Sequence, residues 1–181
     1  MNRINPVDRE TSNDRLRKTF DAIQKQLGVV PNMMRTMAQS PAVLEAYLAF
    51  GAALHRGLLS AGLQEQIALT VAEANACDYC LSAHSALGRG AGLSSDDIVA
   101  SREGRAADPK AAAALQFAGA IVARRGAATE QDFARVRAAG FRDGEIVEII
   151  AHVALNVFTN YFNRAVHTQI DFPVVTAGQL V

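Results

Sequence analysis

Residues 65–84 read EQIALTVAEANACDYCLSAH, and this stretch decides both the fold class and the candidate chemistry. It is made almost entirely of good helix formers, and it contains a C-x-x-C pair, Cys77 and Cys80, followed by His84. The rest of the chain has the same character, because Ala, Leu, Gln, Glu and Arg dominate and alternation of β-branched residues is nearly absent. The sequence therefore predicts an all-α protein.

Glycine and proline divide the chain into about eight helices with short connections. The breaks lie at 28–31, 40–41, 60–62, 88–92, 108–109, 126 and 140. Ser94 followed by Asp97 predicts a capping box at a helix start, and Ser40 before Pro41 predicts another start. The apolar tail, residues 174–181, has no clear helical period. We expect it to pack along the body or onto a neighbouring subunit.

The spacing E-x11-[CN]-x2-[CN]-x3-H occurs twice, with an offset of 83 residues. The first copy consists of Glu65, Cys77, Cys80 and His84, and the second of Glu148, Asn160, Asn163 and His167. The repeat favours one domain over residues 1–181 with an internally duplicated helical hairpin, whose halves span about 41–100 and 109–170. Coincidence is the alternative, because the intervening residues match poorly.

Charge and hydropathy exclude several function classes. The 181 residues contain 18 Lys and Arg against 18 Asp and Glu, without a basic run, which argues against binding to nucleic acid or to an anionic membrane surface. No apolar stretch reaches the roughly 18 residues of a membrane span. Residues 1–18 are polar and do not resemble a secretory signal, so we expect a cytoplasmic protein.

Cys77, Cys80 and His84 are predicted to share one face of a helix. At about 100° per residue, their side chains lie within roughly 60° of one another around the axis. Cα atoms three residues apart in a helix are about 5 Å apart, a separation that a disulfide tolerates. Asn75 is expected to be the N-cap, so that Cys77 lies in the first turn, where a thiolate is favoured. The pair is therefore predicted to open and close as a redox-active disulfide.

His84 is expected to act on Cys80, because side chains four residues apart meet on a helix. A neighbouring histidine generates the nucleophilic thiolate near neutral pH. We assign Cys80 as the thiol that attacks a peroxide and becomes a sulfenic acid, and Cys77 as the thiol that condenses with it to a disulfide. The reverse assignment stays open, because C-x-x-C oxidoreductases often attack with their N-terminal cysteine.

Three residues are candidates for supporting roles around the thiols. Glu73 lies one turn before Cys77 and could accept a hydrogen bond. Tyr79 is expected to be a packing residue or a pocket wall. His152 lies among apolar residues and is expected to be buried, with a place in the lining of the thiol pocket as its functional interpretation.

The two cysteines also allow two other interpretations. They could be two small buried apolar residues, or they could bind zinc together with His84 and either Glu65 or Glu73. Zinc is disfavoured, because structural zinc ligands usually come from two chain segments. The sequence therefore predicts no metal and no cofactor.

Residues 65–80 and 83–84, with the AGLS of residues 91–94, resemble the core of the AhpD-like alkylhydroperoxidase and carboxymuconolactone decarboxylase superfamily. Residues 155–163 (LNVFTNYFN) and 171–173 (DFP) resemble its uncharacterised peroxidase-related branch. The resemblance extends over about residues 31–173. The best-known peroxidases of the superfamily have histidine directly before the second cysteine, where this sequence has Tyr79.

The resemblance implies an AhpD-like helical bundle, a trimeric or hexameric homo-oligomer, and thiol-dependent reduction of a hydroperoxide. It implies that Cys80 is the peroxidatic cysteine, that Cys77 is its partner, and that Glu65 and His84 form a proton relay. An unidentified thiol would regenerate the dithiol. Decarboxylation is disfavoured, because the decarboxylases generally lack the cysteine pair. The alternatives are a non-enzymatic oligomeric module that binds a metal or a small ligand, and a disulfide reductase that acts on proteins.

Overall fold

The computed structural model describes residues 2–179, and these residues form nine α-helices and no strand. The predicted all-α class is confirmed. The helices are α1 (Asp14–Leu27), α2 (Asn32–Met37), α3 (Pro41–Leu54), α4 (Ala61–Ala74), α5 (Asp78–Gly90), α6 (Ser95–Arg102), α7 (Pro109–Ala123), α8 (Glu130–Ala138) and α9 (Asp143–Val166).

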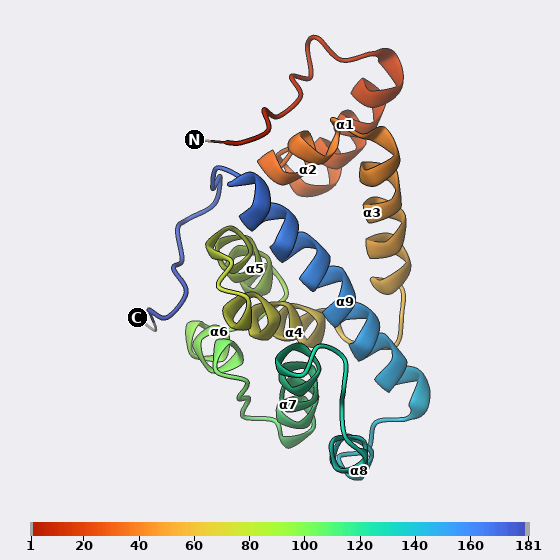
Figure 1. Cartoon of the computed structure of the whole chain (residues 1–181), viewed down its shortest axis with the longest axis vertical. Helices are drawn as coiled ribbons and strands as arrows, with labels where there is room; N and C mark the ends of the chain where they lie inside the picture. Colours follow the sequence, from red (N-terminus) through yellow and green to blue (C-terminus); the bar gives the residue numbers. More distant parts are fainter. Residues whose placement is uncertain (1, 180–181) are drawn as a thin grey trace.

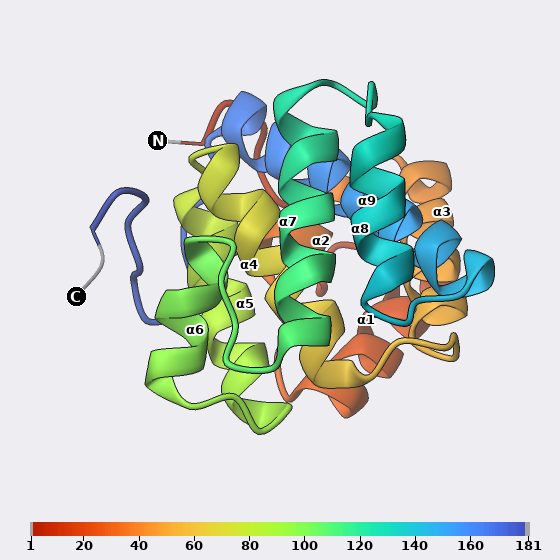
Figure 2. The same ribbon diagram turned by 90° about the horizontal axis from the view of Figure 1, so that it is seen from below.

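The long helix α9 crosses the molecule and contacts helices on both of its sides (Figure 1). One side meets α3, and the other meets α4, α5 and α7. Figure 2 shows α7 and α8 running side by side, in agreement with their direct contact. As a result, residues from the first, middle and last thirds of the chain lie close to one another.

Helix α4 lies between two clusters of buried apolar side chains. Leu69 and Ala72 belong to the cluster that includes the cysteines and α2, whereas Ile67 and Val71 belong to the cluster that includes α7 and α9. All four are at most 2% exposed. A helix that is apolar on several faces is stable only when neighbours cover those faces, which α5, α6, α7 and α9 do here.

Side chains at the helix starts satisfy backbone N–H groups that have no partner within the helix. Ser94 and Asp97 form the predicted capping box of α6, and Thr129 and Asp132 form another at α8. Pro41 occupies the start of α3, as predicted. Local sequence signals therefore set most of the helix boundaries.

The turn between α4 and α5 corrects one prediction. Asn75 does not cap α5; it is the C-cap of α4, Ala76 adopts a left-handed conformation with φ of 49°, and Cys77 is the N-cap of α5. The Cys77 N–H donates to the Ala72 carbonyl at 3.0 Å, which closes the end of α4. No glycine or proline marks this break, which accounts for nine helices where about eight were expected.

The two copies of the repeated spacing differ in backbone. The first copy is divided by the turn between α4 and α5, whereas Glu148, Asn160 and Asn163 lie on the single helix α9. His167 follows as the C-cap of α9, with φ of 54°.

The C-terminal tail packs along the body of the protein, which is one of the two positions expected for it. Ser82 Oγ receives a hydrogen bond from the Val175 N–H at 2.9 Å, and Asp78 Oδ1 receives one from the Ala177 N–H at 2.9 Å. The tail therefore covers the first turns of α5. The last two residues of the predicted tail, 180–181, lie outside the described residues.

Within residues 2–179, no helix combines the length and the apolar character that crossing a membrane would require.

Candidate active site

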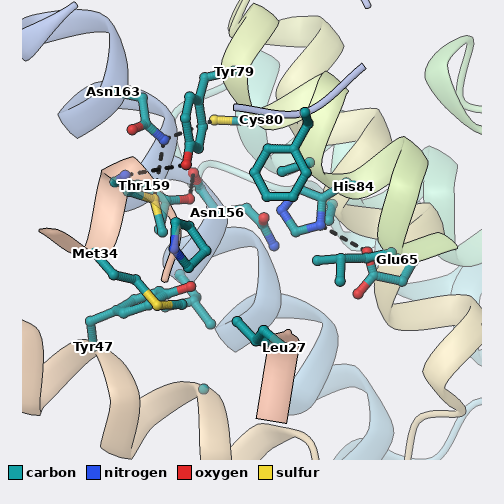
Figure 3. Close-up of a pocket in the computed structure, with 18 of the residues that line it drawn as sticks. Leu27, Met34, Tyr47, Glu65, Tyr79, Cys80, His84, Asn156, Thr159 and Asn163 are labelled. Carbon is teal, nitrogen blue, oxygen red and sulfur yellow. Dashed lines mark hydrogen bonds and ion pairs between the residues drawn. The ribbon is translucent and has the colours of Figure 1, made fainter. Parts of the chain in front are cut away.

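A cavity of about 160 Å³ lies between α2, α3, α4, α5 and α9 (Figure 3). We call it the apolar pocket. Its lining is mostly apolar and includes Leu27, Met33, Met34, Tyr47, Ala68, Leu87 and Leu155. Polar groups in the lining come mainly from α4, α5 and α9, and five of the predicted site residues are in the lining: Glu65, Tyr79, Cys80, His84 and His152.

Cys77 and Cys80 form a disulfide, with their Cα atoms 5.3 Å apart. The turn after α4 places Cys77 at the N-cap, so that its sulfur also accepts a hydrogen bond from the Cys80 N–H at 3.3 Å. Cys80 lines the apolar pocket, whereas Cys77 lines a different hollow. The residues are 1% and 2% exposed, which restricts access to the sulfurs to molecules that can enter these hollows.

His84 and Glu65 form the predicted pair. His84 Nδ1 lies 2.8 Å from Glu65 Oε2, although the two residues come from different helices, α5 and α4 (Figure 3). Both residues line the apolar pocket with Cys80. When Nδ1 donates its proton to the carboxylate, Nε2 is the nitrogen left to accept a proton. The arrangement is that of a base with an orienting acid, in a pocket that the disulfide-bonded Cys80 also lines.

Asn163 is a neighbour of Cys80 that the sequence did not predict. Its Nδ2 group donates to Cys80 Sγ at 3.4 Å and to Met33 Sδ at 3.2 Å, and its Oδ1 is buried without a hydrogen-bond partner. The repeated spacing was the signal that could have found it, because it aligns Asn163 with Cys80.

Tyr79 forms part of the pocket wall, one of the two roles expected for it. Its hydroxyl oxygen accepts a hydrogen bond from the Met33 N–H at 3.2 Å, and its ring packs edge to face against Phe172. Burial raises the pKa of Tyr79 far above its ordinary value, with a smaller contribution from Asp171. Burial, with a smaller effect of Glu65, also raises the pKa of Tyr47 to about 12. Both phenols therefore stay protonated and do not act as bases near neutral pH.

His152, on α9, lines the apolar pocket and is 4% exposed. Its Nε2 is buried and has no hydrogen-bond partner, which is unusual for a buried polar atom. Burial is the main cause that lowers the pKa of His152, and the nearby His55 adds to the effect. His55 itself is engaged, because its Nδ1 lies 2.8 Å from Gln64 Oε1. His152 is thus a neutral polar group with unused hydrogen-bonding capacity.

Glu73 lies away from the pocket lining. Its carboxylate pairs with Arg102 Nε at 2.8 Å and accepts a hydrogen bond from the Gly178 N–H at 2.6 Å. The Arg102 side chain is only 2% exposed, so this is a buried ion pair that joins α4, α6 and the tail. The contacts of Glu73 therefore hold α4, α6 and the tail together and do not reach the apolar pocket.

In the described part of the chain, no group of three or more His, Cys, Asp or Glu side chains is placed to hold a metal ion.

The model of the carboxymuconolactone decarboxylase family matches residues 41–123, from α3 to α7. This segment contains Glu65, both cysteines and His84, but not α9. No curated protein sequence matches the chain.

Solved structures resemble nearly the whole chain. An uncharacterized peroxidase-related protein with an alkylhydroperoxidase AhpD core, from Ralstonia eutropha JMP134, is 26% identical; the match covers 94% of this chain and 92% of that one, with a TM-score of 0.85. The debrominase Bmp8, also solved as a variant with 2,3,4-tribromopyrrole, is 23% identical in that complex, with coverages of 93% and 91% and a TM-score of 0.80. A putative antioxidant defence protein AhpD from Agrobacterium tumefaciens is 24% identical, with coverages of 76% and 95% and a TM-score of 0.68.

Proposed function

Because the chain belongs to the AhpD-like alkylhydroperoxidase and carboxymuconolactone decarboxylase superfamily, we propose that it is a thiol-dependent peroxidase for small hydroperoxides. One observation carries the proposal. Cys80 lines an apolar pocket together with the His84–Glu65 pair, and its disulfide partner is the neighbouring Cys77. A nucleophilic cysteine, a base and an orienting acid thus line one small pocket, and the resolving cysteine is bonded to the first from outside it.

In the oxidative half-reaction, His84 Nε2 takes the proton of the Cys80 thiol, and Glu65 fixes the imidazole by accepting from Nδ1. The Cys80 thiolate attacks one oxygen of ROOH. The O–O bond breaks, Cys80 becomes a sulfenic acid, and the alkoxide RO⁻ takes up the proton from His84 and leaves as ROH. The thiol of Cys77 then attacks the Cys80 sulfur, the S–O bond breaks, and water leaves as the disulfide forms.

Two residues of α9 complete this scheme. The Asn163 amide, 3.4 Å from Cys80 Sγ, would donate a hydrogen bond to the thiolate once the disulfide is open. His152 is kept neutral by burial, so its imidazole can donate a hydrogen bond to the oxygen that leaves. In this role, the buried Nε2 of His152, which has no hydrogen-bond partner in this structure, would gain one.

The test of the proposal is peptide mass spectrometry after the reduced protein has received one equivalent of hydroperoxide. The wild type should return to the Cys77–Cys80 disulfide. Cys77→Ala should still consume one equivalent and stop at a sulfenic acid on Cys80, whereas Cys80→Ala should barely react. A sulfenic acid that accumulates on Cys77 instead would reverse the two roles, and a reduced wild type that leaves the peroxide untouched would refute the peroxidase.

His84→Ala is the matched variant for the base. Alkylation of reduced Cys80 at neutral pH should slow by about tenfold, because the thiolate fraction falls. An unchanged alkylation rate in this variant would exclude His84 as the activating base. The substitution leaves both cysteines and the pocket wall formed by Tyr79 in place.

A second candidate function is reductive dehalogenation of a small aromatic compound. The apolar lining suits an aromatic ring, and the dithiol supplies the two electrons that replace a carbon–halogen bond by carbon–hydrogen, giving the disulfide and a hydrogen halide. The likeness to the debrominase Bmp8 supports testing it. Release of bromide from a bromopyrrole, without consumption of peroxide, would favour this function over the first.

The other two alternatives have weaker support. A disulfide reductase acting on proteins needs an accessible sulfur, yet both cysteines are at most 2% exposed. A ligand-binding module without catalysis would not explain why the His84–Glu65 pair shares a pocket lining with a cysteine of the disulfide.

We also propose that the protein is a homo-oligomer. Apolar side chains on α3 and α9 are exposed on this chain, with Phe50 41%, Val147 63%, Phe158 42% and Tyr161 59% exposed. Exposed apolar groups of this size on packed helices are typical of surfaces that a partner covers. A second copy of the chain is the partner that the superfamily implies.

A further inference from the structure

The two cysteines of the disulfide line two different hollows. Cys80 lines the apolar pocket, whereas Cys77 lines an open groove of about 1100 Å³ that we call the polar groove. Its polar lining includes Asp78, Arg164, His167, Thr168 and Gln169. Tyr79 and Asn163 line both hollows and so form the wall between them.

We propose that the polar groove binds the reductant, a low-molecular-weight thiol that carries a carboxylate, and that this thiol attacks Cys77. The inference rests on the proposed peroxidase function for its purpose, since the oxidised dithiol must be reduced after each turnover. Substrate and reductant would then reach the same disulfide from separate hollows and would not compete for one space.

The direction of attack supports Cys77 as the target. A thiolate attacks a disulfide in line with the S–S bond, from the side of the attacked sulfur that faces away from its partner. A molecule in the polar groove meets Cys77, and a molecule in the apolar pocket meets Cys80. A charged thiol would lose its hydration in the apolar pocket, whereas the groove offers polar partners.

The leaving group supports the same choice, because disulfide exchange is faster when the departing thiolate is stabilised. Attack on Cys77 expels the thiolate of Cys80. The Asn163 amide already donates to that sulfur at 3.4 Å. His84 lines the same pocket and can return a proton to it.

The reduction balances with two thiols. The first thiolate, RS⁻, forms an S–S bond to Cys77 as the Cys77–Cys80 bond breaks and Cys80 leaves as a thiolate. The second thiolate attacks the sulfur of the bound R group, which releases RSSR and the Cys77 thiolate. Both protein thiolates take up the protons lost by the two RSH molecules. Two electrons pass from the thiols to the protein disulfide.

The side chains of the groove favour an anionic ligand. Arg164 donates to the Asn75 carbonyl at 2.7 Å, and among the described residues no carboxylate forms an ion pair with it. The acid in the lining, Asp78, already accepts from the Ala177 N–H. Thr168 is 8% exposed, and its hydroxyl is buried without a partner. A carboxylate beside Arg164 would therefore meet a cation that no described carboxylate pairs with, next to the buried and unpartnered hydroxyl of Thr168.

The test measures the rate at which the oxidised protein is reduced by 3-mercaptopropionate, which is anionic, and by cysteamine, which is cationic. The ratio of the two rates is compared between wild type and Arg164→Gln, so that the intrinsic reactivity of each thiol cancels. Loss of one charge-assisted interaction should lower the ratio by about tenfold. Arg89→Gln, on α5 with Cys80 but outside the groove, should keep the wild-type ratio.

A second measurement locates the attacked sulfur. Acid quenching during reduction by a limiting amount of 3-mercaptopropionate, followed by peptide fragmentation, should find the mixed disulfide on Cys77. A mixed disulfide on Cys80, or equal rate ratios in wild type and Arg164→Gln, would overturn the inference. If the reduced wild type consumes no peroxide while both results hold, the peroxidase proposal fails and the reductant site stands.

Discussion

Acidification from about pH 7.5 to about pH 5.5 should destabilise the protein through His152, and His152→Gln should lose that part of the pH dependence. The folded protein lowers the pKa of His152 below its ordinary value of 6.5, with burial as the main cause. The unfolded chain therefore binds a proton near pH 6.5 that the folded chain does not yet bind. Stability that is present above pH 6.5 is lost as the pH falls through the folded pKa.

The loss of stability through His152 is limited by the binding of a single proton. A difference of one bound proton changes the free energy of unfolding by about 1.4 kcal/mol per pH unit, so His152 contributes at most that slope between the two pKa values. This is a measurable share of a typical domain stability of about 5–15 kcal/mol. The lowered carboxyl pKa values of Asp97, Asp132 and Glu145 start from 3.8 to 4.5, so those groups act at lower pH.

Urea unfolding followed by circular dichroism, with the disulfide intact, measures this difference. The wild type should lose stability in the window below pH 6.5 faster than His152→Gln. His167→Asn, which removes an exposed histidine instead of a buried one, should keep the wild-type pH dependence. Parallel curves for wild type and His152→Gln would refute the view that His152 is held neutral in the pocket.

Three further outcomes are expected. Ala76→Gly should raise the free energy of unfolding by about 0.5–1 kcal/mol in thermal melts, because Ala76 adopts φ of 49°; no change would show that the turn bears no strain. Glu73→Gln should lower the free energy of unfolding by about 2 kcal/mol, because Arg102 loses its buried partner. It should not slow thiol alkylation; slower alkylation would give Glu73 a catalytic role. Phe158→Glu should reduce the mass found by light scattering, whereas a monomeric wild type would contradict the proposed oligomer.

The local part of the site could be predicted from the sequence. The C-x-x-C spacing predicted the disulfide, and the spacing of Cys80 and His84 predicted that these two residues line one pocket. The prediction that Cys77 shares their helix face is wrong, because Cys77 is the N-cap of α5 and lines a different hollow. Helix starts at Ser94 and Pro41 were predictable because capping depends on neighbouring residues only. The pairing of Glu65 with His84 was predicted from the family resemblance, and the contact between α4 and α5 brings it about.

The rest of the site depends on contacts between distant segments. Asn163 and Met33 are 130 residues apart, and no periodicity along one helix shows that they meet beside Cys80. The shift of the N-cap from Asn75 to Cys77 depends on the left-handed Ala76, a conformation that the residue type disfavours. The buried state of His152 was expected from its apolar neighbours, but its unpartnered nitrogen follows from packing across helices.

The contribution of α9 to the pocket sets an order of events during synthesis. Asn163 follows Cys80 by 83 residues, so at about 5–20 residues per second a ribosome needs roughly 4 to 17 s to add it after the cysteine. During this interval the nascent chain has neither the α9 wall nor the tail over α5. Its thiols are then open to the oxidants and disulfides of the surrounding cell. In the finished protein, these molecules must enter one of the two hollows to reach the cysteines. A chain truncated before α9 should accordingly accumulate mixed disulfides that the full-length protein avoids.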